Sequence, residues 1–148
     1  MVRYRKLLTG LLALPLALAA CAPTASDEGF PRLQEAFNAT EHKLAVLGIA
    51  RLSEMLELYR LDVGSYPTTE QGLQALRTRP SHVDTWQGPY ADSDSKLEDP
   101  WHRRFVYRNP SSREGYDFDL CSYGLHGKPG GAGRDATVCN EHARSNRG

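Results

Sequence analysis

The chain has 148 residues, of which 18 are basic and 18 acidic, so its formal net charge is zero. This balance gives no reason to expect a nucleic-acid partner, and the length suits one small domain with a short additional segment. The three cysteines form an odd set, which normally indicates a leftover thiol unless one of them has a separate use.

The first 20 residues have the composition of a secretory signal peptide. Three basic residues lie within the first six positions, and the apolar run over residues 7–19 is too short to span a membrane comfortably. Residues 18–21 (Leu-Ala-Ala-Cys) resemble a bacterial lipobox, in which the cysteine is acylated and becomes the new N-terminus. We therefore expect residues 1–20 to be removed and Cys21 to carry lipid. An ordinary signal peptide with a free Cys21 is the alternative.

The segment after the cysteine is expected to be a tether that leads into a helix, over residues 21–40. It begins with small and polar residues, which is typical of a flexible linker. The residue after Cys21 is alanine rather than aspartate, which by analogy with other lipoproteins favours the outer membrane over the inner one.

A long amphipathic helix is predicted from about Pro31 to Leu61. Its apolar residues recur every three or four positions, as one face of a helix requires. Those residues are Ala45, Ile49, Leu52, Leu56, Tyr59 and Val63. The C-terminal half of this face is expected to pack on a globular head. Ala45, Ile49, Leu52 and Leu56 are also the predicted face for assembly with neighbouring subunits.

The helix is predicted to end at Gly64, because glycine readily closes a helix C-terminus and Pro67 cannot continue the helix. Thr68 or Thr69 can then cap a second, shorter helix over Glu70–Arg77.

Beyond these helices the sequence predicts a small antiparallel sheet. Trp86 and Tyr90 are expected to cover the core from a long loop. Residues 105–108 and 116–123 alternate as strands do. In the second strand, Tyr116, Phe118 and Leu120 are placed on one side, and Asp117, Asp119 and Cys121 on the other. The predicted fold class is α+β, with the long N-terminal helix packed on two or three antiparallel strands and a C-terminal loop.

Several of these segments resemble the major pseudopilins of type II secretion systems. The resemblance rests on residues 59–73, on Asp99-Pro100-Trp101, on residues 116–120 and on the glycine-rich segment 124–133. It extends over about residues 44–140 and implies a pilin-like domain at residues 41–140, followed by a disordered tail at 141–148. It also implies a non-enzymatic subunit whose partners are other pseudopilins or secretion components.

The N-terminus departs from that family. Pseudopilins begin with a prepilin leader and about twenty apolar residues, whereas Gly29-Phe30 is followed here by proline and by a mixed polar helix. Arg32 and Glu35 would be costly in a bilayer core. Prepilin processing is therefore not expected, and a lipid anchor is predicted to replace the apolar helix.

The resemblance also bears on calcium, which major pseudopilins bind through aspartates of the C-terminal loop. The corresponding positions here are His126, Arg134, Asp135 and Thr137, so one carboxylate remains beside an arginine. Calcium prefers six to eight oxygen ligands, several of them carboxylates. No cofactor is therefore predicted, and Asp135 and Thr137 are only weak calcium candidates.

Cys121 and Cys139 flank this loop, and export would place them in an oxidising compartment. We expect a disulfide between them that replaces the metal as a staple, and two free thiols are the alternative. A zinc site from His102, His126, His142 and the cysteines lacks the usual ligand spacing. No hydrolase or phosphate-loop motif occurs either.

The predicted function is that of a lipid-anchored, pseudopilin-like subunit of a type II secretion system, facing the periplasm. The alternative is a separate envelope lipoprotein that uses a pseudopilin-like head to bind an exoprotein or another ligand.

Overall fold

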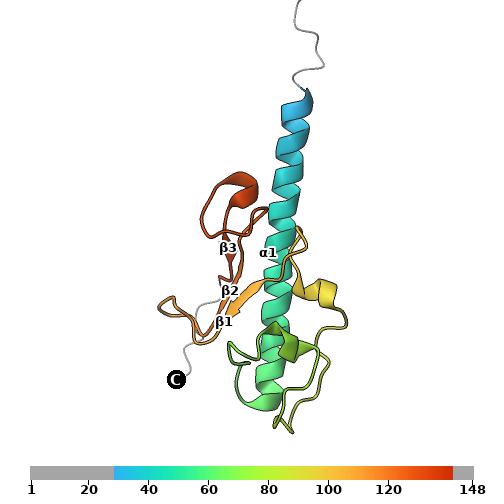
Figure 1. Ribbon diagram of the computed structural model, residues 1–148, viewed down its shortest axis with the longest axis vertical. Coiled ribbons are helices and arrows are strands. Elements are labelled where there is room, and N and C mark those ends of the chain that lie inside the picture. The colour runs from blue at the N-terminus through green and yellow to red at the C-terminus, as the bar shows by residue number, and fades with distance from the viewer. Residues whose placement is uncertain (1–28, 142–148) are drawn as a thin grey trace, which may run out of the picture.

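The computed structural model describes residues 29–141, and Figure 1 shows one long helix with a small sheet and several loops packed along it. This arrangement confirms the predicted α+β class. The predicted signal peptide, the lipid-bearing Cys21 with its tether, and residues 142–148 of the predicted tail lie outside the described residues.

The long helix α1 spans Gly29–Val63, two residues more at each end than predicted. Pro31 is tolerated because it lies in the first turn, where its missing N–H has no partner to lose. Gly64 ends the helix as predicted, with a φ of 90° and an N–H that donates to the Arg60 carbonyl at 2.8 Å. The N-terminal part of α1 extends beyond the sheet and loops (Figure 1).

One face of α1 forms one side of the hydrophobic core. It contributes Ile49, Leu52, Leu56 and Tyr59, all buried. They pack against side chains from residues 64–141, which together with the part of α1 they cover we call the head. These side chains are Leu73, Leu76, Leu97, Phe105, Phe118 and Leu120. Burial of each large apolar side chain stabilises the fold by about 1.5–3 kcal/mol. Trp86 and Tyr90 pack against this cluster, as predicted.

The sheet has three short antiparallel strands in the order β1-β2-β3. They are β1 (Val106–Arg108), β2 (Asp119–Ser122) and β3 (Val138–Cys139). Tyr107 lies opposite Leu120, and Cys121 lies opposite Cys139. Both predicted strands are present but shorter than expected.

The predicted helix over Glu70–Arg77 is reduced to a single 3₁₀ turn, η1 (Leu73–Leu76). The reason lies just before it. The Thr68 N–H donates to Gln71 Oε1 at 2.8 Å, and the Gln71 N–H donates to Thr68 Oγ1 at 3.2 Å. This reciprocal capping pair begins a helical turn, but Gly72, with a φ of 57° and a ψ of −165°, is not helical and ends that turn before η1. Tyr107 Oη and Asn109 Nδ2 each donate to the Pro67 carbonyl at 2.9 Å. These hydrogen bonds join the segment between α1 and η1 to β1.

The sequence places Asp119 on the opposite side of its strand from Leu120, and the structure shows that Asp119 is buried as well. All four residues of β2 are buried, and the loop between β1 and β2 folds back onto Asp119. The Asp119 carboxylate accepts hydrogen bonds from Ser111 Oγ at 2.6 Å, from Ser112 N at 2.8 Å and from Arg113 Nε at 2.7 Å. Burial alone would raise the pKa of Asp119, but the hydrogen bonds from Ser111, Arg113 and Ser112 lower that pKa far below its usual range.

Candidate functional site

The residues predicted to form an assembly face are not available for assembly. Ala45, Ile49, Leu52 and Leu56 are between 0% and 4% exposed, because the head covers them. The prediction of an assembly role for these four residues is therefore wrong. They form the most regular apolar stripe of the helix, and this stripe packs into the core of the head.

A second apolar face of α1 is exposed, and we call it the exposed seam. It consists of Phe30, Leu33, Phe37, Leu44, Leu47, Leu58 and Leu61, whose exposure ranges from 51% to 78%. From residue 30 to residue 61, the positions of the seam are spaced alternately three and four residues apart. The positions of this pattern that are not apolar hold Thr40, Arg51 and Glu54. Such a series is the pattern by which helices pack side by side. At 3.6 residues per turn, the seam lies about a third of a turn from the buried face.

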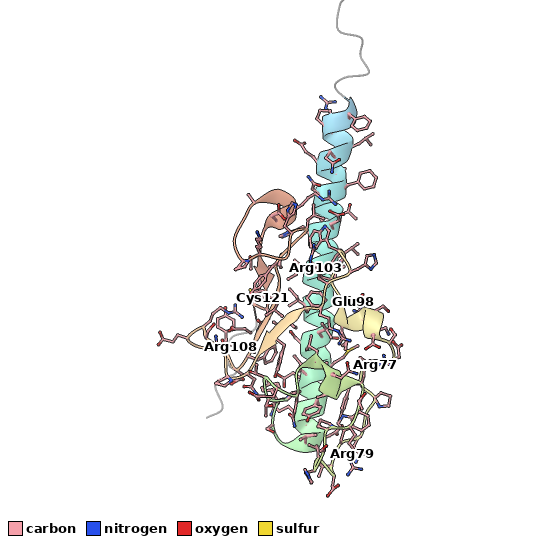
Figure 2. All side chains as sticks on the ribbon, viewed as in Figure 1. Arg77, Arg79, Glu98, Arg103, Arg108 and Cys121 are labelled. Carbon is pink, nitrogen blue, oxygen red and sulfur yellow. A yellow bond between two sulfur atoms is a disulfide. The ribbon has the colours of Figure 1, made fainter. Side chains whose placement is uncertain are left out.

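The surroundings of the seam change along the helix. Residues 30–37 are all exposed, and no other part of the described chain lies beside them (Figure 1). Leu44 and Leu47 border a shallow hollow whose other side is the loop that contains Glu98, labelled in Figure 2. Arg51 turns toward this loop and donates to the Lys96 carbonyl at 2.9 Å. None of the helices within residues 29–141 combines the length with the apolar composition that a membrane span needs.

The C-terminal loop is the second notable feature. Cys121 and Cys139 form the predicted disulfide between directly opposed residues of β2 and β3, with a Cα–Cα distance of 4.1 Å. The bridge closes a segment with a sequence separation of 18, which contributes about 3 kcal/mol in the chain-entropy account. Figure 2 labels Cys121 beside the helix, at the base of this loop.

Inside the loop, two segments of main chain lie in close contact. The Leu125 N–H donates to the Arg134 carbonyl at 2.8 Å. Arg103, labelled in Figure 2, supports the loop from outside through a hydrogen bond from Nη1 to the Gly124 carbonyl at 3.1 Å.

The loop residues that the resemblance offered as calcium ligands already make other hydrogen bonds. Asp135 Oδ1 accepts the His126 N–H at 2.9 Å and lies 2.7 Å from His126 Nδ1. These contacts with His126 lower the pKa of Asp135. The Thr137 hydroxyl accepts the Gly130 N–H at 2.8 Å. With one carboxylate, already hydrogen-bonded and next to an arginine, this donor set does not fit calcium.

The histidines and cysteines weighed for zinc do not form a site within the part of the chain that the structure describes. Residues 29–141 hold no group of three or more histidine, cysteine or acidic side chains placed to bind a metal ion. His142 lies outside these residues. The features left as functional candidates are the exposed seam and the loop.

Comparisons with known proteins agree with this architecture. A family model described as "Type II secretion system (T2SS), protein G" matches residues 32–141. Type II secretion system core protein G of Xanthomonas campestris pv. campestris is 38% identical over 95 residues, which cover 64% of this chain and 62% of that protein. The Vibrio cholerae protein of the same name is 34% identical over 103 residues, which cover 68% of each chain. This chain thus spans 62–68% of the length of these two relatives.

A solved structure is also similar, the major pseudopilin from the type 2 secretion system of enterohaemorrhagic Escherichia coli. It has a TM-score of 0.53 and 26% identity, and the match covers 82% of this chain and 97% of that one. The resemblance found in the sequence motifs is thereby confirmed. The chain belongs to the type II secretion system protein G family.

Proposed function

We propose that this chain is a non-enzymatic, pseudopilin-like structural subunit of a type II secretion system. In this role α1 and the head pack against like subunits or other pseudopilins. The observation that carries the proposal is the exposed seam, because an isolated head gains nothing from seven exposed large apolar residues on one helix face. Family membership supports the same reading.

Charged substitutions in the seam should prevent assembly without unfolding the head. Leu47→Asp with Leu58→Asp removes two exposed leucines and places charge in the contact. Burial of a leucine contributes about 1.5–3 kcal/mol, so we expect roughly 100-fold less crosslinking to secretion components in cells. Thermal unfolding of the purified variant should match that of the unsubstituted chain.

The matched control is Ala50→Asp, an exposed position of the same helix that lies outside the seam. It should crosslink normally. Unchanged crosslinking of the Leu47 and Leu58 variant would contradict an assembly role. A monomer that instead captures an exoprotein would favour the alternative, a separate envelope lipoprotein.

We further propose that Cys21 anchors the chain by lipid in the cell envelope, facing the periplasm, with the outer membrane favoured. The lipobox-like residues 18–21 and the alanine after Cys21 support this. The intact mass of the protein from its native membrane should correspond to a chain that begins at acylated Cys21 and lacks two hydrogens for the Cys121–Cys139 bridge. A mass that fits cleavage after Gly29, or an unacylated chain, would contradict the anchor.

A further inference from the structure

We propose that an ion pair between Glu41 and Arg134 fastens the C-terminal loop to α1 in the place of a bound calcium ion, so that the order of the loop does not depend on calcium. The proposal concerns the loop alone. It does not depend on whether the chain assembles through the exposed seam.

The pair has the geometry of a strong contact. Arg134 Nε lies 2.8 Å from Glu41 Oε2, and Arg134 Nη2 lies 2.9 Å from Glu41 Oε1. Two parallel hydrogen bonds of this kind fix the direction of both side chains as well as their distance. The side chains are 25% and 33% exposed, so the contact is partly shielded from water.

The position of the pair explains what it does. Glu41 lies on α1, and Arg134 lies on η3 (Gly133–Asp135), 93 residues later. The Arg134 carbonyl also accepts the Leu125 N–H across the loop. One residue therefore joins the two sides of the loop through its main chain and joins the loop to the helix through its side chain.

The same residues explain why the loop would not need a metal ion. Arg134 replaces a carboxylate of the pattern that the resemblance implied, and its guanidinium would repel a cation. His126 and Thr137 replace two more, and within the loop the His126 ring contacts Asp135 while the Thr137 hydroxyl accepts the Gly130 N–H. The loop is thus closed by side-chain contacts at the positions where ligands were expected.

The test combines calcium titration with hydrogen exchange on the purified full-length chain. For the unsubstituted chain, the unfolding temperature should differ by less than about 1 °C between millimolar calcium and excess chelator, because a ligand that does not bind the native state cannot stabilise it. Arg134→Gln should make amide exchange over residues 124–137 about five- to tenfold faster.

The control is Arg79→Gln, which breaks the exposed contact between Arg79 and Asp84 and should leave exchange in the loop unchanged. Glu41→Gln, and the double variant with Arg134→Gln, should each match the Arg134→Gln result, because all three remove the same interaction. The proposal is overturned if calcium raises the unfolding temperature or slows exchange in the unsubstituted loop. It is also overturned if Arg134→Gln exchanges no faster than Arg79→Gln.

Discussion

Replacement of Asp119 by alanine is expected to lower the free energy of unfolding by about 2–3 kcal/mol, because it removes a buried carboxylate that accepts charge-assisted hydrogen bonds from a partly exposed arginine and its neighbours. The Asp119 side chain is 11% exposed and accepts the Arg113 Nε–H at 2.7 Å. Arg113 Nη1 in turn donates to the Asn140 carbonyl at 3.0 Å, and Arg113 Nη2 donates to Asn140 Oδ1. Asn140 Oδ1 also accepts the Leu120 N–H at 2.9 Å. Loss of the carboxylate would therefore loosen the β1–β2 loop and the end of β3 together.

Denaturant unfolding measures this effect. Asp92→Ala, which removes an exposed carboxylate paired with Lys96, is the matched control and should leave the free energy of unfolding unchanged. An Asp119→Ala variant as stable as this control would show that the hydrogen bonds to Asp119 contribute nothing net.

The same carboxylate should make stability depend on pH. The pKa of Asp119 is lowered in the folded chain, so the folded state binds a proton less readily than the unfolded one. Its contribution is therefore fully present above the unfolded pKa, near 4, and declines as the pH falls below that value. Asp119→Asn should reduce the loss of stability on acidification.

Much of the fold follows from local sequence signals. The spacing of Leu52, Leu56 and Tyr59 predicts a helix with one buried face, and Gly64 with Pro67 predicts where it ends. These signals act over one or two turns of chain, so they can be read without knowledge of the rest. The disulfide could also be predicted, because the expected export and the expected separate use of Cys21 leave Cys121 and Cys139 as partners.

The errors concern residues whose environment is set by distant segments. Strand alternation separates Asp119 from the apolar side of β2, but it does not indicate that the β1–β2 loop folds back and supplies three hydrogen-bond partners to its carboxylate. The contact of Glu41 with Arg134 joins residues 93 positions apart, and neither has a local signal for it. The apolar spacing favours the most regular stripe as the assembly face, but the head covers that stripe. The alternating steps of three and four from Phe30 to Leu61 could have identified the exposed seam, because two apolar stripes on one helix indicate two contacts.

The other large effect is expected at Gly124, where alanine should lower the free energy of unfolding by about 2–4 kcal/mol. A Cβ at this position would lie 2.3 Å from the Arg134 carbonyl oxygen and 2.7 Å from the Asp135 Cα, both main-chain atoms. Overpacking of this kind costs about 1–3 kcal/mol, and the left-handed backbone, with a φ of 67°, adds about 1 kcal/mol for any residue with a Cβ. The two sides of the loop would have to separate, which would also break the hydrogen bond from Leu125 to Arg134.

Gly130→Ala separates these two causes. Gly130 also has a positive φ, of 93°, but nothing lies within 4 Å of a Cβ built there. Its alanine variant should therefore show only the conformational cost, about 1 kcal/mol. Denaturant unfolding of both variants under oxidising conditions compares them with the disulfide intact. Equal losses at the two glycines would mean that backbone conformation alone sets the cost. A larger loss at Gly124 would mean that close packing of main chain against main chain holds the loop in the shape that presents Arg134 to α1.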